Sequence, residues 1–99
     1  MSLTSKQRAY LKSLSNHLNA AFQIGKNSIT PEYTKAIDET LEKNELIKLG
    51  VLKNCMDDPR ELAEMLAERT HSEVVMVIGK KIILYRESKE KKKIVLPRD

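Results

Sequence analysis

Apolar positions follow two different spacings along the chain, and the alternation between them predicts its secondary structure. Leu11, Leu14 and Leu18 recur at helical spacing, after a T-x-x-Q capping-box pattern that begins at Thr4. Residues 20–24 then form a short, mostly apolar run that is typical of a strand. The N-terminal part of the chain therefore predicts a helix followed by a strand.

Two further helices are predicted to begin at a Thr-Pro and an Asp-Pro pair. In each pair the polar side chain caps the first turn, and the proline takes a position where no amide hydrogen is needed. One helix should run from Pro31 to about Asn44, and the other should begin at Pro59. Between them, residues 46–52 predict a strand in which Gly50 indicates a bulge or a close approach of another group.

The last third of the chain predicts a hairpin. Residues 74–78 are an almost continuous apolar run, which indicates a strand buried on both faces. Gly79-Lys80 suits a two-residue turn, and residues 81–85 form the returning strand. The order α-β-α-β-α-β-β predicts a single α/β (α+β) domain, with a four-stranded mixed sheet packed with helices and parallel pairs joined by right-handed crossovers. We expect this domain over residues 1–88.

Composition fits one globular domain, and the charge is unevenly spread. Of the 99 residues, 40% are hydrophobic and 32% are charged, with a net charge of +4. Residues 1–31 carry four bases and no acids, residues 32–73 carry six bases and eleven acids, and residues 74–99 carry eight bases and three acids. Basic ends around an acidic middle indicate a polarised particle with a face that attracts phosphate. Lysines that only keep the domain soluble explain the charge equally well.

Catalytic and metal-binding patterns are missing from the sequence. His17 and His71 stand alone, Cys55 is the only cysteine, and the acidic pairs at 38–39 and 57–58 are explained by a helix surface and a helix cap. We therefore expect no enzymatic activity, no metal, no cofactor and no small-molecule substrate. The chain has no apolar stretch of about 18 residues and no secretory signal, so a cytoplasmic protein with no membrane partner is expected.

The main functional hypothesis concerns the loop between the first strand and the second helix. Gly25 permits a close approach of the backbone to a ligand, Lys26 adds a positive charge, and Asn27 and Ser28 add hydrogen-bonding side chains. The following helix begins with outward-facing backbone donors and the positive end of its dipole. Such a loop is able to clamp a sugar-phosphate backbone, but an ordinary strand-to-helix turn explains the same residues.

Five short motifs occur in a fixed order between about residues 3 and 88. They are T-x-x-Q-R-x-Y-L from Thr4, H-L from His17, Q-I-G-K from Gln23, E-L-I-K from Glu45 and I-G-x-x-I-I-L-Y-R from Ile78. In this combination the sequence resembles the YhbY-type proteins, the stand-alone bacterial form of the CRM (chloroplast RNA splicing and ribosome maturation) domain.

The resemblance implies both a fold and a function. The family fold is a four-stranded mixed sheet packed with helices, similar to the C-terminal domain of translation initiation factor three. Family members bind RNA, and bacterial ones associate with precursors of the large (50S) ribosomal subunit. The implied partner is ribosomal RNA in pre-50S particles, and we expect a ribosome-associated monomer. Because exposed aromatic residues look scarce, we expect recognition of structured RNA through its backbone and shape.

The resemblance also implies which residues contact RNA. The family's GxxG loop falls on Gly25, Lys26, Asn27 and Ser28, so Ser28 replaces the final glycine and any positive φ there would cost strain. Asn19 stands where family members often have a basic residue, and we expect both changes to weaken RNA affinity without abolishing it. The bases expected around the loop are those of the first helix, which should be exposed, and those of the last hairpin. They are Lys6, Arg8, Lys12, Lys80, Lys81 and Arg86.

Two features leave alternatives open. The charged tail at residues 89–99 either adds an electrostatic RNA contact or only aids solubility, and its segment 94–97 is able to dock as an edge segment. The second and third predicted helices are acidic, so a protein-interaction module that docks basic ribosomal proteins is the alternative function. The acids of those helices are Glu32, Asp38, Glu39, Glu42, Glu61, Glu64 and Glu68.

Overall fold

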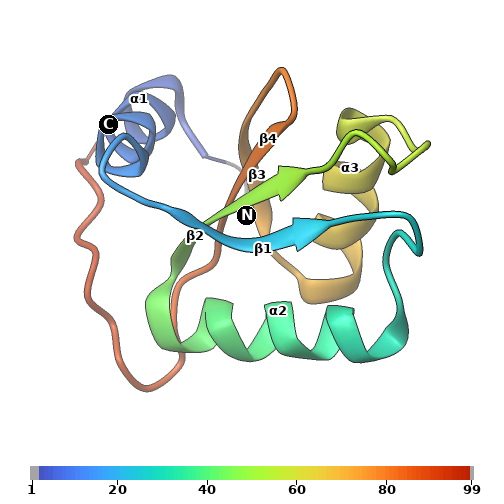
Figure 1. Cartoon of the computed structure of the whole chain (residues 1–99). Helices are drawn as coiled ribbons and strands as arrows, with labels where there is room; N and C mark the ends of the chain where they lie inside the picture. Colours follow the sequence, from blue (N-terminus) through green and yellow to red (C-terminus); the bar gives the residue numbers. More distant parts are fainter. Residues whose placement is uncertain (1–2, 99) are drawn as a thin grey trace.

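The computed structural model describes residues 3–98, which form three helices and one four-stranded sheet (Figure 1). The order and the mixed sheet confirm the predicted α+β fold. The elements are α1 (Ser5–Ser15), β1 (Ala20–Ile24), α2 (Pro31–Asn44), β2 (Leu46–Val51), α3 (Pro59–Thr70), β3 (Glu73–Ile78) and β4 (Lys81–Tyr85).

Local capping interactions begin all three helices where the sequence predicts. At α1, the Thr4 hydroxyl accepts from the Gln7 N–H and the Gln7 carboxamide accepts from the Thr4 N–H, both at 3.1 Å. The Thr30 and Asp58 side chains cap α2 and α3 in the same way, and each is followed by proline. The predicted two-residue turn between β3 and β4 is also confirmed, because Gly79 adopts a positive φ of 56°.

The strands lie in the order β1-β2-β4-β3. β1 pairs with β2 in parallel, whereas β4 pairs in antiparallel with both β2 and β3. The sheet therefore contains one parallel pair of neighbours, and the connection through α3 passes over β4 to reach the edge position of β3.

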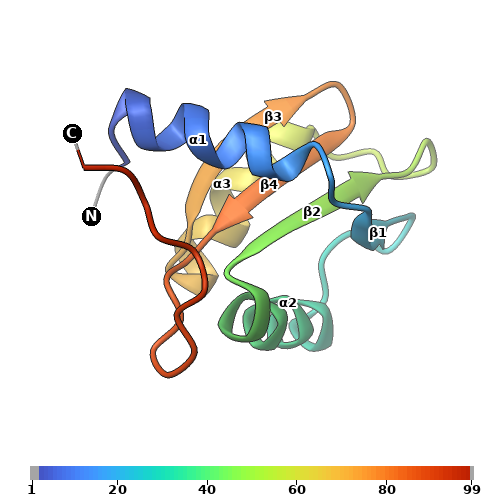
Figure 2. The same cartoon turned by 90° about the vertical axis from the view of Figure 1, so that its left-hand side faces the viewer.

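The two faces of the sheet carry separate cores. On one face, α2 and α3 bury a cluster that includes Ile37 and Leu66 against the sheet. On the other face, α1 and the C-terminal segment cover a smaller cluster that includes Leu11 and Ile83, with Ile94 packed against it (Figure 2).

The prediction that residues 74–78 are buried on both faces is wrong for Ile78, which is 61% exposed at the end of the edge strand β3. Residues 74–77 pack on both faces, although only Val75 is fully buried. Val74 and Val77 pack against the α2–α3 cluster, while the intervening Val75 and Met76 pack against the α1 cluster. The register shift between β3 and β4 at this point is a bulge, which turns two consecutive side chains to the α1 face.

The C-terminal segment is attached to α2 through two carboxylates. Glu45, which caps the C-terminus of α2 and is fully buried, accepts the backbone N–H groups of Ser88, Lys93 and Ile94 at 2.7–2.8 Å. Burial alone would raise the pKa of Glu45, but these donors outweigh it and hold the pKa below its ordinary value. Glu42 has a lowered pKa because it accepts from the Ser88 hydroxyl and from nearby backbone N–H groups.

Candidate nucleic-acid interface

Residues 25–28 form a tight turn, which we call the GKNS turn. The Ser28 N–H donates to the Gly25 carbonyl at 2.9 Å, so Lys26 and Asn27 occupy the tip, where both are exposed. Ser28 adopts a left-handed conformation with φ 54°. Ser28 therefore adopts a positive φ at the position where the family's loop has its final glycine. The shape of the turn does not depend on a second glycine.

Gly25 is not required by the fold around it. Its φ lies outside the left-handed region, and a Cβ placed there would lie 3.5 Å from both Asn54 Oδ1 and Leu52 Cδ1, which is ordinary van der Waals contact. Without a side chain, the backbone at this point stays open to an approaching ligand.

A shallow depression of about 280 Å³ lies beside the turn, between the end of β1 and the start of α2. Tyr33 forms part of its wall, where the phenol donates to the Gln23 carbonyl and the ring packs edge-to-face on Phe22 at a centroid distance of 5.5 Å. These contacts fix the position of the ring. The lining residues are Gln23, Gly25, Lys26, Asn27, Ser28, Thr30 and Tyr33.

The N-terminus of α2 offers fewer donors than the sequence suggested. Pro31 has no N–H, and the Tyr33 and Thr34 N–H groups donate to the side chain and carbonyl of Thr30. In addition, Glu32 places a negative charge in the first turn. The attraction for phosphate must therefore come chiefly from side chains around the turn, and only secondarily from the helix.

Two of the predicted bases, Lys80 and Lys81, lie at the same end of the sheet as the GKNS turn (Figure 2). The Leu52 N–H donates to the Ile24 carbonyl and the Val51 N–H donates to the Lys80 carbonyl, each at 2.8 Å, so the ends of β1, β2 and β4 are tied together. Both lysines are exposed, and neither they nor Lys26 form an ion pair within residues 3–98.

Sequence reasoning missed Lys53, a fourth exposed lysine at this end of the sheet. It lies in the β2–α3 loop between Leu52 and Asn54, the residues that adjoin Gly25. The signal that predicts its position is the parallel pairing of β1 with β2, because the carboxyl ends of parallel neighbours meet at one edge of a sheet. We call the surface formed by Lys26, Lys53, Lys80 and Lys81 the lysine cluster.

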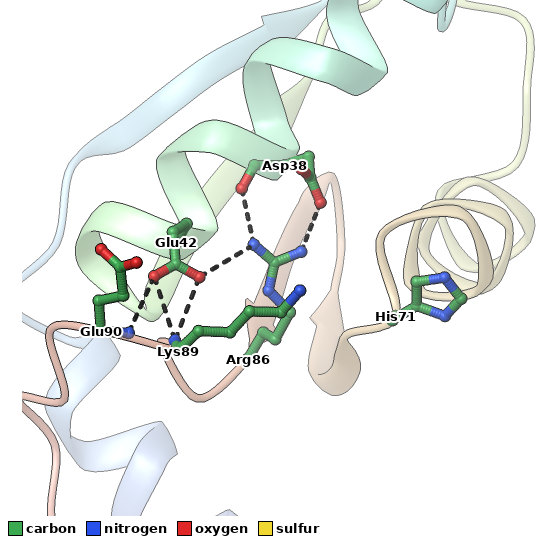
Figure 3. Close-up of a pocket in the computed structure, with 6 residues that line it drawn as sticks. All are labelled: Asp38, Glu42, His71, Arg86, Lys89 and Glu90. Carbon is green, nitrogen blue, oxygen red and sulfur yellow. Dashed lines mark hydrogen bonds and ion pairs between the residues drawn. The ribbon is translucent and has the colours of Figure 1, made fainter.

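Arg86, in contrast, lies at the opposite end of the sheet, directly after the residue of β4 that pairs with Leu46. Its guanidinium donates to the Thr70 carbonyl at 2.7 Å and to the carboxylate and carbonyl of Asp38, and Glu42 lies 3.9 Å away (Figure 3). These bonds join β4 to α2 and α3 beside an open pocket of about 550 Å³. The structure therefore gives Arg86 an internal structural role and does not bring it to the GKNS turn.

The predicted bases of α1 have different surroundings. Arg8 was expected to be exposed, but it is only partly exposed because it donates to the carbonyls of Val74 and Val75 at the bulge of β3. Lys6 and Lys12 are exposed on α1, as expected. No hydrogen bond or ion pair joins them to the GKNS turn in the part of the chain that the structure describes.

A family model described as the CRS1 / YhbY (CRM) domain matches residues 3–86. The chain belongs to this CRM family. The Bacillus subtilis (strain 168) protein named Probable RNA-binding protein YqeI is 46% identical over 95 residues, which cover 96% of this chain and 99% of that protein. A Haemophilus influenzae protein named RNA-binding protein is 34% identical over 96 residues, covering 97% and 96% of the two chains.

A solved structure has the same CRM fold. It is the solution structure of the hypothetical protein SAV1595 from Staphylococcus aureus, described as a candidate RNA-binding protein, with a TM-score of 0.80 and 55% identity. The alignment covers 97% of this chain and all of that one. The resemblance to the YhbY-type proteins is thereby confirmed, both as a family and as a fold.

Within residues 3–98, no group of three or more His, Cys, Asp or Glu side chains is arranged to hold a metal ion, and Cys55 is buried in the core. No helix in the same region is long and apolar enough to cross a membrane. The candidate interface offers charge from the lysine cluster and hydrogen-bonding groups from the GKNS turn.

Proposed function

We propose that this CRM domain is an RNA-binding protein that acts in assembly of the large (50S) ribosomal subunit. The observation that carries the proposal is the lysine cluster, in which four exposed lysines that form no ion pair within residues 3–98 lie in or near the GKNS turn and its open backbone at Gly25. The names of the relatives support RNA as the ligand. Ribosomal RNA in pre-50S particles, a cytoplasmic and ribosome-associated location and a monomeric state form the finer part of the proposal.

The contacts that we propose are mainly to phosphate. Lys26 at the tip of the turn and Lys80 and Lys81 in the hairpin contact the RNA backbone, while Asn27 and the open backbone at Gly25 add hydrogen bonds. Lys6 and Lys12 extend the surface along α1. Each phosphate neutralised by a lysine contributes about −0.7 to −0.9 to the slope of log affinity against log salt, so contacts from the four residues of the lysine cluster give a slope of about −3.

Filter binding to fragments of ribosomal RNA at several salt concentrations tests the proposal. Lys26→Glu should weaken binding at least tenfold, because it removes a cation and adds an anion beside the RNA. Lys43→Glu is the matched control, since Lys43 is also exposed but lies in the last turn of α2, at the opposite end of that helix from the GKNS turn. An affinity that is undetectable or independent of salt, or an equal loss in both variants, would contradict the proposal.

Ribosomal RNA as the ligand needs a test in cells. Crosslinking followed by sequencing of the bound RNA should give reads concentrated in the RNA of the large subunit, and Lys26→Glu should deplete them. Reads spread over other transcripts would leave RNA binding intact but refute the role in subunit assembly.

A second candidate function is docking of basic ribosomal proteins by the acidic helices. Exposed carboxylates remain on α3 at Glu61, Glu64 and Glu68, whereas Asp38 and Glu42 on α2 are already engaged by Arg86 and the C-terminal segment. Charge reversal of the three α3 residues should release the protein from ribosomal particles if this candidate is correct, and Lys26→Glu should not.

A further inference from the structure

A row of directly paired residues crosses all four strands next to the GKNS turn. Gln23 of β1 pairs with Gly50 of β2, Gly50 pairs with Lys81 of β4, and Lys81 pairs with Ile78 of β3. Because alternate residues of a strand share a face, Lys81 lies on the same face as the buried Ile83, which is the face that α1 covers. We call these four residues the open row.

Three of the four residues of the open row are exposed. They are Gln23, Lys81 and Ile78, which is 61% exposed although it is a large apolar residue. The fourth, Gly50, is buried beneath the Gln23 side chain. Three interstrand spacings make the row about 14 Å wide. The row is thus a partly apolar strip beside the lysine cluster, and no helix or strand within residues 3–98 covers its exposed side chains.

The carboxamide of Gln23 lies over the backbone of Gly50, where a Cβ would collide with Gln23 Oε1 and come within 3.1 Å of Cδ. Its polar atoms form no hydrogen bond with any other described residue, so one acceptor and two donors remain available. An exposed carboxamide without a hydrogen-bond partner is suited to reading the edge of a base.

The open row is continuous with the candidate RNA site. Gln23 lines the depression beside the GKNS turn together with Gly25 and Lys26, and Lys81 belongs both to the row and to the lysine cluster. An RNA strand whose phosphate is held at Lys26 therefore meets Gln23 first and then Lys81 and Ile78. The positive charges of Lys26 and Lys81 along this path favour a polyanion over a neutral or basic partner.

We propose that the open row is a subsite for unpaired nucleotides of the RNA held by the GKNS turn, an inference that rests on the proposed function. Gln23 hydrogen-bonds a base edge, Ile78 packs against a base or ribose, and Lys81 contacts a phosphate. Bases paired in an A-form helix present their edges in a groove that side chains cannot read, whereas splayed bases of loops and bulges expose them. The structured RNA thus contributes a loop or bulge at this position.

Fluorescence anisotropy with short single-stranded homopolymers of A, C or U, and with an RNA duplex of equal length, tests the subsite. Gln23→Ala and Ile78→Ala should each weaken binding of unpaired RNA about fivefold and change duplex binding less than about twofold. Gln23→Ala should also reduce discrimination among the three homopolymers. Because neither substitution alters charge, the salt slope should not change.

Val95→Ala is the matched control, since Val95 is 83% exposed on the C-terminal segment. If Gln23→Ala and Ile78→Ala bind unpaired RNA as Val95→Ala does, while Lys26→Glu lowers affinity, the subsite is refuted and the proposed function stands. If Lys26→Glu also leaves affinity unchanged, the proposed function fails with it. Ile78 is an exposed edge residue, so its variant remains informative even if Gln23→Ala disturbs the sheet.

Discussion

The left-handed conformation of Ser28 predicts that Ser28→Gly stabilises the protein. Ser28 has φ 54°, which costs a residue with a Cβ about 1–2 kcal/mol and costs glycine nothing. Glycine loses about 0.5–1 kcal/mol more backbone entropy on folding. The Ser28 hydroxyl makes no hydrogen bond with any other described residue, so its loss leaves no partner unsatisfied. The free energy of unfolding should therefore rise by about 0.5–1 kcal/mol.

Two neighbouring substitutions isolate the backbone effect. Asn27→Gly changes the adjacent residue of the turn, whose φ is not positive, and should lower stability by about 0.5–1 kcal/mol through chain entropy alone. Ser28→Ala keeps the Cβ and should stay within about 0.5 kcal/mol of the parent. Urea unfolding followed by circular dichroism measures all three, and Ser28→Gly should raise Tm by about 2–8 °C.

The reasoning is refuted if Ser28→Gly and Asn27→Gly lower stability by the same amount, because the turn would then have no left-handed residue at position 28. The substitution also bears on RNA affinity. Since Ser28 already adopts the conformation that a glycine would favour, Ser28→Gly should change affinity less than about twofold. A large gain in RNA affinity would instead support the expectation that serine at position 28 weakens RNA binding by the loop.

Three further predictions concern residues at the end of the sheet opposite the GKNS turn. The folded-state pKa of Glu45 is lowered, so its ionised form stabilises the fold above its ordinary pKa of about 4.3, and this contribution is lost as the pH falls through the folded pKa. Glu45→Gln should lower neutral-pH stability by about 2 kcal/mol and flatten the acid decline in urea titrations. Arg86→Ala should lower the free energy of unfolding by about 2–3 kcal/mol, because the bonds to Asp38 and Thr70 are lost. The same substitution should change RNA affinity less than about twofold. A tenfold loss of RNA affinity in the folded variant would contradict this. Burial raises the pKa of Tyr85 to about 12, and the Tyr85 hydroxyl has no hydrogen-bond partner in residues 3–98. The stability of Tyr85→Phe in thermal melts should therefore equal that of the parent or exceed it by up to about 1 kcal/mol.

The parts of the fold that the sequence predicts are those decided by neighbouring residues. The caps at Thr4, Thr30 and Asp58 and the turn at Gly79 involve groups within a few positions of one another. Such interactions recur wherever the pattern occurs, so pattern reading locates them. The candidate loop is predictable for the same reason, because it lies between a strand end and a helix cap.

The roles of the basic residues are not predictable in this way. Arg8 bonds to residues 66 and 67 positions later, and Arg86 bonds to Asp38, 48 positions earlier. A linear sequence shows all bases as equal charges, whereas the fold decides which of them meet an internal acceptor. Lys53 was missed for the converse reason, since only the parallel pairing of β1 and β2 brings its loop beside Gly25.

The internal bonds of Arg8 and Arg86 and the exposure of the lysine cluster have a common physical explanation. A guanidinium presents several donors in a fixed fork, so one side chain satisfies carbonyls at a bulge or joins two helices to a strand, as Arg8 and Arg86 do. An ammonium on a flexible stem keeps its hydration at the surface and contacts phosphate as a point charge. Arg8 and Arg86 therefore fix the edge and the far end of the sheet, whereas the lysine cluster lies at the end where the GKNS turn and the open row meet. Replacing Lys80 and Lys81 with arginine should accordingly preserve the salt slope of RNA binding, because the charge is unchanged, whereas replacing Arg86 with lysine should lower the stability of the fold.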